Sequence, residues 1–363
     1  MKVYAQQVKI KKIPILNKTS FIKFLIIVLF TFHLFSCKKK LDTSDIELKT
    51  DILRIITYDN FIICGIANNI AAEFEKMYDC TIIFEIVGEG SELLNNIIER
   101  KDTITADIVI GIDNNFINKA LSTNIFLANE PDNLKNIIDK SLLIDKRFRL
   151  IPYNYNYYAF LYDNEIVSTP PKTFGEIQNA VWRDKIILVD PNSSSVGYGL
   201  ILWSLGIWGE RGFEQYWERV YKNVSSVQPS LSDAYFAFVT GEAPIMFSYV
   251  TSSSYINEQE KTSRYSTFIP EEGNYRMIEF AGIIHGAKNL YLARRFMEFM
   301  LTPSFQKHVA TSQWMFPIIN EVQIPSGFIN ITIPKKDLSE KINSKPNNFS
   351  EKWIESWSKI MIK

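Results

Sequence analysis

Beyond residue 50, short apolar runs alternate with amphipathic segments. The runs at 53–58, 81–87 and 107–112 are rich in Ile and Val and predict buried strands, while the segments at 67–77 and 91–99 predict helices. Strands and helices in alternation are typical of an open parallel sheet that is covered by helices. We therefore predict an α/β fold that begins in the order strand, helix, strand, helix, strand.

Polar residues follow each of these three strands. They read Tyr-Asp-Asn at 58–60, Gly-Glu-Gly-Ser at 88–91 and Asp-Asn-Asn at 113–115. The carboxyl ends of parallel strands lie at one edge of a sheet, where α/β sheets bind their ligands. One such cluster is most often a simple turn, but three in succession predict a binding site. Its candidate residues are Tyr58, Asp59, Glu89 and Asp113.

The alternation continues after a long aromatic run at 151–162, which predicts a strand that crosses into a second lobe. Thr173 and Glu176 have the spacing of a capping box, which opens a helix. Further strands are predicted at 186–189, 244–249 and 276–284, the last of them returning to the first lobe, and further helices at 200–208, 212–221, 231–240, 290–300 and 303–310. The sequence contains no internal repeat and no low-complexity segment.

A Ser-rich turn at 190–199 joins the strand at 186–189 to the helix at 200–208. This order places backbone N–H groups and the positive end of a helix dipole at the edge of the sheet. Such a turn can seat an anion or a polar ligand, and it can equally serve as a helix cap. The candidate ligand residues in it are Ser193, Ser194, Ser195 and Gly197.

The N-terminal region has the pattern of an export signal. Six lysines and no acidic residue precede residue 24, and the uncharged apolar run 24–32 follows. Leu-Phe-Ser-Cys at 34–37 resembles the lipobox of bacterial lipoproteins, in which Cys37 becomes the lipidated first residue. The apolar run is about half of the ~20 residues that a transmembrane helix needs, so processing is favoured over anchoring. We predict a lipoprotein signal at 1–36, a charged tether at 37–50, and a lipid-anchored location in the periplasm or at the cell surface.

The composition beyond residue 36 narrows the classes of function. The 34 basic and 40 acidic residues there argue against nucleic acid as a partner. The chain is long enough for two lobes. Besides Cys37, only Cys64 and Cys80 remain, which cannot form a Cys-based zinc site, and whether they pair is left open. With His285 and His308 as the only histidines beyond residue 36, we expect no metal site, no cofactor and no His-based catalysis.

Several motifs occur in an order that resembles the thiamine-binding periplasmic proteins of bacterial ABC importers. They lie at 57–61, 106–115, 190–191, 197–200, 241–242, 248–252 and 314–317, and the resemblance covers nearly the whole chain after residue 52. It implies a type II-like periplasmic-binding-protein fold, in which a hinge joins two α/β lobes and which is related to ferric-iron and polyamine binders. It also implies a non-enzymatic, monomeric protein that captures thiamine or its phosphate esters. The partner that it implies is a permease with a cytoplasmic ATPase. We expect one lobe at 51–155 and 275–363 and the other at 156–274.

The chemistry of thiamine agrees with the candidate residues. Thiamine carries a thiazolium cation, a flat aminopyrimidine and a hydroxyethyl tail. A flat cation favours a nearby carboxylate and aromatic faces, each face contributing roughly 0.5–2 kcal/mol. At the matching positions, ring faces come from Tyr58, Tyr249, Tyr255 and Trp314, charge from Asp59 and Asp113, and partners for the aminopyrimidine from Glu89 or Asn154. The resemblance further implies that the turn with Ser193, Ser194, Ser195 and Gly197 holds the hydroxyl or a phosphate, and that Tyr235 faces the same cleft.

The sequence departs from the family pattern at three places. Cys64-Gly65-Ile66 stands where the family has a Trp-Gly-Pro segment, Leu231 replaces a Trp, and Asn154 replaces an Asp. The loss of two rings and one carboxylate can weaken the affinity or change which thiamine-like cation is preferred. The order of preference among thiamine, its monophosphate and its diphosphate is left open.

Three other functions stay open at this point. A binding protein of the same fold for ferric iron would use tyrosines such as Tyr249 and Tyr255, although iron-binding pairs are usually adjacent, and the carboxylate-rich box of a polyamine binder is not evident. A hydrolase acting at the Ser-rich turn would need a base near Ser194, and the chain has no nucleophile elbow. A ligand-sensing lipoprotein would be encoded without a permease and an ATPase beside it.

Overall fold

The computed structural model describes residues 51–88, 90–344 and 351–362. They belong to the larger of two compact units, Lys49–Lys363. The expected signal at 1–36, the lipidation site Cys37 and the tether at 37–50 lie outside the described residues. Among the residues that are described, no helix combines the length and the apolar character that crossing a membrane requires.

The described strands form one mixed, ten-stranded sheet. Its main path is β2-β1-β3-β10-β5-β8-β6-β7, with β4 paired to β10 and β9 paired to β5. The strands are β1 Ile52–Thr57, β2 Thr81–Ile86, β3 Ile108–Asp113, β4 Phe126–Leu127, β5 Ile151–Asp163, β6 Ile186–Val189, β7 Val224–Gln228, β8 Ile245–Tyr249, β9 Tyr265–Phe268 and β10 Arg276–Ile284.

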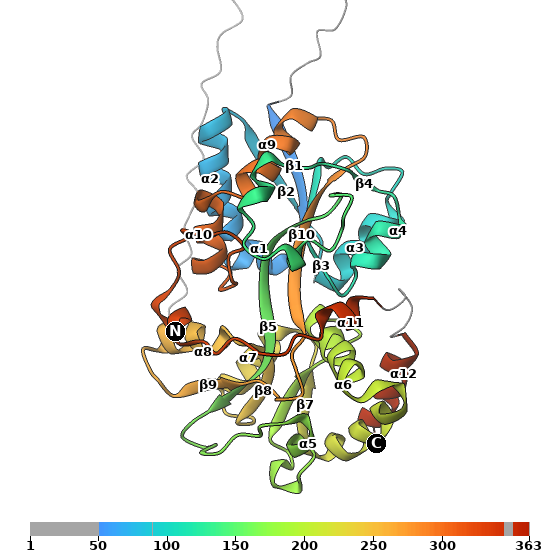
Figure 1. Ribbon diagram of the computed structural model, residues 1–363, viewed down its shortest axis with the longest axis vertical. Coiled ribbons are helices and arrows are strands. Elements are labelled where there is room, and N and C mark those ends of the chain that lie inside the picture. The colour runs from blue at the N-terminus through green and yellow to red at the C-terminus, as the bar shows by residue number, and fades with distance from the viewer. Residues whose placement is uncertain (1–50, 89, 345–350, 363) are drawn as a thin grey trace, which may run out of the picture. The chain divides into compact units, whose positions relative to one another are not determined.

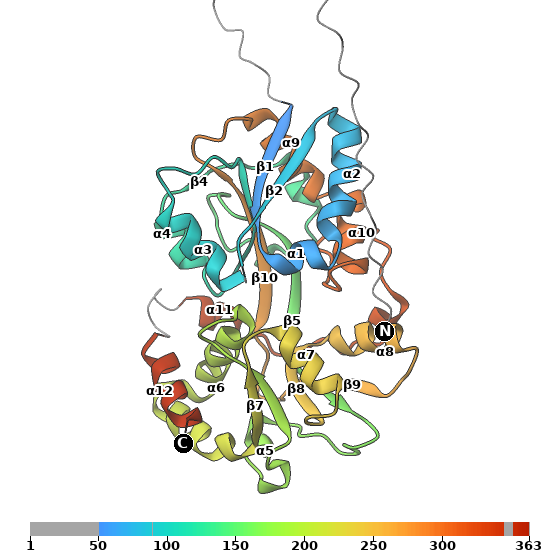
Figure 2. The same cartoon turned by 180° about the vertical axis from the view of Figure 1, so that it is seen from behind.

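The described helices cover this sheet (Figures 1 and 2). They are α1 Asp59–Ile63, α2 Ile66–Tyr78, α3 Gly90–Glu99, α4 Ile117–Ser122, α5 Phe174–Ile177, α6 Ser195–Val220, α7 Leu231–Val239, α8 Ser252–Glu260, α9 Leu290–Met300, α10 Pro303–Thr311, α11 Ser339–Asn343 and α12 Glu351–Met361. Short 3-10 turns lie at Asp132–Asn136, Lys140–Leu142, Ala180–Trp182, Tyr221–Asn223 and Ser326–Asn330.

Two long strands, β5 and β10, run through the middle of the sheet (Figure 1). β1 is parallel to β2 and β3, and β10 is antiparallel to both β3 and β5. The part of β5 up to Tyr157 pairs with β10, and the part from Tyr158 onward pairs with β8 and β9. We call β1–β4 with α1–α4, α9 and α10 the first half of the fold, and β6–β9 with α5–α8 the second half. The two halves meet along β5 and β10.

Aromatic side chains fill the core of each half. In the first half, the ring of Phe74 on α2 lies 5.3 Å from that of Phe296 and 5.5 Å from that of Phe299, both on α9. In the second half, Trp203 on α6 packs edge-on against Phe174 at 4.7 Å. Burial of rings of this size removes much apolar area from water and stabilises both halves.

The strands and helices expected from periodicity are present, with one difference around α6. The segments expected as separate helices at 200–208 and 212–221 are two helices that meet at a kink at Gly209, whose φ is 63° and ψ is 179°, and the label α6 covers both. The first of them begins earlier than expected, inside the Ser-rich turn, because the hydroxyl oxygen of Ser194 accepts a hydrogen bond from the backbone N–H of Val196. Cap residues of this type favour a helix start.

The C-terminal helix α12 packs against α6 (Figure 2). The ring of Trp353 lies 5.2 Å from that of Phe213, and the ring of Trp357 lies 5.9 Å from that of Trp217. We expected all of 275–363 to belong with the first half. Helix α12 instead lies on the second half, because its two tryptophans bury themselves against α6.

Candidate ligand-binding site

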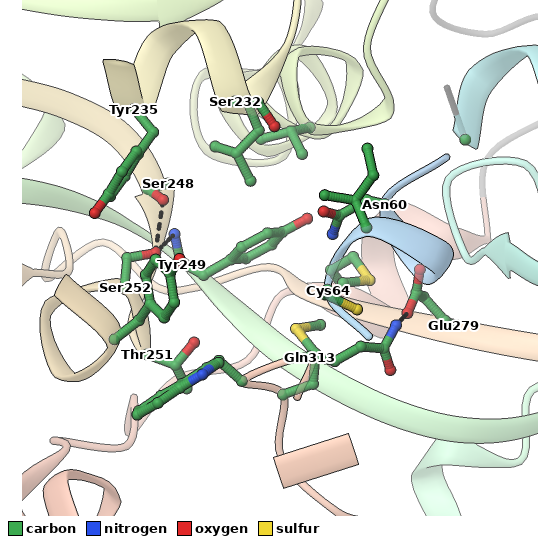
Figure 3. A pocket seen from close by; sticks show the side chains of 18 of the residues that line it. Asn60, Cys64, Ser232, Tyr235, Ser248, Tyr249, Thr251, Ser252, Glu279 and Gln313 are labelled. Carbon is green, nitrogen blue, oxygen red and sulfur yellow. Dashed lines mark hydrogen bonds between the residues drawn. The ribbon is translucent and has the colours of Figure 1, made fainter. Parts of the chain in front are cut away.

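A cavity of about 600 Å³ lies where the two halves of the fold meet. The first half contributes the end of β1, α1, the end of β3 and the loop after α10, and the second half contributes the starts of α6 and α7 and the segment from the end of β8 into α8. The central strand β10 contributes Met277 and Glu279. Figure 3 shows Asn60, Cys64, Glu279 and Gln313 on one side, and Tyr235, Ser248 and Ser252 on the other.

The structure brings eight of the expected ligand residues to this cavity. They are Tyr58, Asp113, Ser194, Ser195, Tyr235, Tyr249, Tyr255 and Trp314. Their sequence positions are far apart, so it is the meeting of the two halves that collects them. Glu89 lies outside the described residues.

Asp59, Ser193 and Gly197 do not line the cavity. Asp59 is half-buried in the first turn of α1. The hydroxyl of Ser193 donates to the backbone carbonyl of Pro229 at 2.6 Å. A Cβ at Gly197 would lie 2.3 Å from the carbonyl oxygen of Val189, so glycine there allows α6 to approach β6 closely.

Tyr58 lies directly over a glycine. Gly111 has a φ of 110°, and a Cβ on it would lie 2.4 Å from the ring of Tyr58. The hydroxyl of Tyr58 donates to Oε1 of Glu279 at 2.6 Å and accepts from the side-chain amide of Gln313 at 3.2 Å. Tyr58 therefore lines the cavity as a buried ring with a fully engaged hydroxyl.

The sequence reasoning missed Glu279. Its carboxylate accepts from the hydroxyls of Tyr58 at 2.6 Å and Tyr153 at 2.8 Å, and from the amides of Asn154 at 2.5 Å and Gln313 at 3.3 Å. Burial raises the pKa of Glu279, while these donors oppose the rise. One signal could have found it, since Glu279 is the only acidic residue in the strand 276–284 and the only charged residue in it after Arg276.

Asp113 is the second buried carboxyl of the cavity. Its Oδ1 accepts from the backbone N–H of Asn115 at 3.0 Å, and its Oδ2 accepts from the hydroxyl of Ser195 at the start of α6. Burial, followed by the negative charge of Glu279, raises the pKa of Asp113 well above its usual range. The contact with Ser195 also joins the first half of the fold to the second.

Aromatic rings form another wall of the cavity. The ring of Tyr255 lies 5.8 Å from that of Tyr235 and 5.4 Å from that of Trp314, and Tyr249 stacks on Tyr158 at 5.4 Å. Burial raises the pKa of Tyr235 to about 12, so its phenol is neutral at physiological pH. Trp314 has a φ of 58°, an uncommon value for a residue with a side chain. Backbone strain of this kind is concentrated at functional sites.

Small polar side chains complete the lining, and sequence reasoning had not selected them. The hydroxyls of Ser248 and Ser252 lie 2.7 Å apart, and Thr251 accepts from the amide of Asn156 at 2.7 Å. The other polar side chains that line the cavity are Asn60, Cys64, Ser232, Gln259, Thr311, Ser312 and Gln313. None of the lining residues is Lys, Arg or His. The described part of the chain holds no group of three or more His, Cys, Asp or Glu residues placed to bind a metal ion.

A mixed sheet with a polar and aromatic cavity where its two halves meet defines the class of solute-binding proteins. Residues 103–341 match the family model described as "Bacterial extracellular solute-binding protein". The chain belongs to this family of bacterial extracellular solute-binding proteins. The family resemblance and the binding-protein fold expected from the sequence motifs are thereby confirmed.

Two relatives show which members of this family the chain is similar to. The chain is 36% identical to the thiamine-binding periplasmic protein of Brucella melitensis, over 79% of this chain and 86% of the relative. It is 30% identical to the protein of the same name from Escherichia coli, over 85% of this chain and 93% of the relative.

Solved structures agree with these relatives. A periplasmic thiamin binding protein superposes with a TM-score of 0.77 at 29% identity, covering 85% of this chain and 96% of the other. The apo ferric ion-binding protein A of Pasteurella haemolytica superposes with a TM-score of 0.72 at 13% identity, covering 85% of this chain and 98% of the other. At this low identity, the similarity shows a shared fold only.

Proposed function

We propose that this chain is the substrate-binding component of a bacterial ABC importer and that it captures thiamine in the cavity between the two halves of its fold. The observation that carries the proposal is the lining of that cavity. Two buried carboxyl groups and several aromatic rings line it, and no basic side chain does. A flat organic cation is the ligand class that complements such a site.

The wall formed by Tyr235, Tyr255 and Trp314 suits the two flat rings of thiamine. The three side chains are half-buried, so part of each ring is open to the cavity. Each cation–π contact contributes roughly 0.5–2 kcal/mol, and the value is highest where water is excluded. The polar side chains Asn60, Ser232 and Gln259 also line the cavity and offer hydrogen-bond partners for the aminopyrimidine and the hydroxyl group.

The resemblance implies that the Ser-rich turn holds the hydroxyl or a phosphate of the ligand, and Ser194 and Ser195 of this turn line the cavity. The hydroxyl of Ser193 donates to Pro229, that of Ser195 donates to Asp113, and that of Ser194 caps α6. These hydroxyls already have partners within the protein. The turn therefore also supports the start of α6 and its link to the first half, and titration with thiamine and thiamine monophosphate measures which of the two is preferred.

Capture involves closure of two lobes and no breakage of a bond. The chain crosses between the halves in β5, between Tyr157 and Tyr158, and again through β10. We assign 51–155 and 275–320 to one lobe, and 156–274 to the other together with 321–344 and α12, because α11 and α12 pack on α6 and the 3-10 turn Ser326–Asn330 packs on α8. A few residues at such crossings can absorb a hinge rotation.

The same proposal places the protein, as a monomer, outside the cytoplasm on a lipid anchor at Cys37, next to a permease with its ATPase. The support is the basic and apolar pattern of 1–36 and the Leu-Phe-Ser-Cys sequence at 34–37. Cells that express the chain and are fed radiolabelled palmitate should label it, and Cys37→Ser should remove the label. Equal labelling of both proteins would refute the anchor and leave the binding proposal untouched.

Calorimetric titration of the purified full-length chain tests ligand capture. Carried-over ligand is first removed by unfolding and refolding, and thiamine, thiamine monophosphate, spermidine and ferric citrate are then titrated separately. We expect a thiamine Kd below about 1 μM, which corresponds to about −8 kcal/mol. Binding of spermidine or ferric citrate without binding of thiamine would refute the proposal.

The aromatic wall is tested with Trp314→Ala. Losing one ring face should weaken thiamine binding roughly 2- to 30-fold. Trp182→Ala is the matched control, because Trp182 lies in a 3-10 turn and does not line the cavity. Equal affinity in both variants would show that Trp314 does not contact the ligand.

A further inference from the structure

Glu279 and Asp113 lie directly opposite each other on neighbouring strands. The antiparallel register of β10 and β3 pairs their Cα atoms. Side chains at such positions have Cβ atoms about 4.5–5.5 Å apart, and like charges directly opposite each other are destabilising. Both side chains are less than a tenth exposed, and both line the cavity.

Among the described residues that line the cavity, none carries a positive charge that could compensate this pair. The titratable groups that face Glu279 are Tyr58 from the end of β1, Tyr153 from β5, and Cys64 at the end of α1. Those that face Asp113 are Tyr158 from β5 and Tyr275, which precedes β10. Burial raises the pKa of each of these five groups, so they are neutral at physiological pH.

The two carboxyl groups differ in their hydrogen-bond partners. Glu279 accepts from four side chains, two of which are the amides of Asn154 and Gln313, whereas Asp113 accepts from three groups: the backbone and side-chain N–H groups of Asn115 and the hydroxyl of Ser195. The other two donors to Glu279 are the hydroxyls of Tyr58 and Tyr153. Four donors fill the acceptor positions of a carboxylate, so they favour the ionised form of Glu279.

Asp113 can carry a proton without losing its partner in the second half. The hydroxyl of Ser195 donates to Oδ2 of Asp113 when the carboxyl is ionised, and it can accept from the same oxygen when the carboxyl is protonated. A buried acid beside a second, ionised acid favours the protonated form. Because Asp113 has fewer hydrogen-bond donors than Glu279, the arrangement favours one proton on the pair, carried by Asp113.

We propose that the carboxylate of Glu279 recognises the fixed positive charge of the ligand, and that Asp113 releases its proton to solvent as the cation enters. The proposal rests on the proposed function, because it assumes that thiamine binds in this cavity. The cation replaces the proton as the charge that compensates the second carboxyl. A neutral ligand of the same shape leaves the proton on Asp113 and forms no ion pair with Glu279.

Titration calorimetry of the full-length chain in two buffers that differ in ionisation enthalpy, phosphate and Tris, counts the released protons. Two ligands are compared near neutral pH: thiamine and 3-deazathiamine, in which a neutral thiophene replaces the thiazolium. We expect proton release with thiamine alone, and an affinity at least about tenfold higher for thiamine. Equal affinities without proton release would overturn this proposal, whereas a chain that binds neither ligand would overturn the proposed function.

Two variants separate the roles of the carboxyl groups. Glu279→Gln should weaken thiamine binding about tenfold or more and leave 3-deazathiamine binding within about twofold, whereas loss of packing would weaken both equally. Asp113→Asn should abolish proton release and keep the preference for thiamine. Glu73→Gln removes the same charge from an ion pair with Lys307 outside the cavity, and should alter neither property. A Glu279→Gln protein with an unchanged preference for thiamine would overturn the role of Glu279.

Discussion

Gly111 supports the binding cavity, and replacing it with alanine should damage both the fold and the site. A φ of 110° is strained for any residue with a side chain, at a cost of about 1–3 kcal/mol. The added Cβ would also lie 2.4 Å from the ring of Tyr58. Overpacking of this kind costs about 1–3 kcal/mol. The ring cannot move freely, because its hydroxyl is held by Glu279 and Gln313. We therefore expect Gly111→Ala to lower the free energy of unfolding by about 2–6 kcal/mol.

Gly286→Ala is the matched control. Gly286 has a φ of 84°, and a Cβ on it would meet nothing within 4 Å, so it carries backbone strain without a clash. Urea unfolding of the ligand-free proteins gives both free energies, and titration with thiamine gives both affinities. Gly286→Ala should lose about 1–3 kcal/mol of stability and keep its affinity. In a Tyr58→Ala background, Gly111→Ala should cost no more than the control. Equal losses in the two single variants, with unchanged affinity in both, would refute the reasoning.

Three further predictions concern pH and the C-terminal helix. The affinity for thiamine should fall as the pH drops through the raised pKa values of Asp113 and Glu279, because protonation removes the charge that attracts the cation. Titrations with thiamine across a pH series measure this effect, and an affinity that does not change with pH would show that these groups are not involved. Hydrogen-bond and ion-pair partners on α10 lower the pKa of Glu73 to about 2. The contribution of the ionised Glu73 to stability is therefore complete above its usual pKa and is lost as the pH falls towards 2. Urea unfolding should show that Glu73→Gln is less stable at neutral pH and that its stability depends less on acid. Trp357→Ala should destabilise the protein by about 3–5 kcal/mol, measured by urea unfolding, because the buried ring packs on α6, and a loss below about 1 kcal/mol would contradict that packing.

Much of the fold follows from local patterns in the sequence. Runs such as 81–87 and 107–112 are apolar enough to be strands in any α/β arrangement, and the caps at Thr173 and Thr302 mark where helices begin. The same local logic placed Tyr58 and Asp113 at strand ends, where the cavity lies. Ordered motifs then identified the family and indicated the aromatic residues Tyr235, Tyr249, Tyr255 and Trp314.

The charge balance of the site was decided by tertiary structure. Glu279 lies within a strand, and only the antiparallel register of β10 on β3 brings it opposite Asp113. The hydroxyls of Ser193 and Ser195 looked available in the sequence, yet Pro229 and Asp113 engage them in the fold. Likewise, the burial of its tryptophans on α6 decides the position of α12. Periodicity and capping are properties of neighbours along the chain, whereas register, hydrogen-bond partners and burial depend on segments that meet only when the chain has folded.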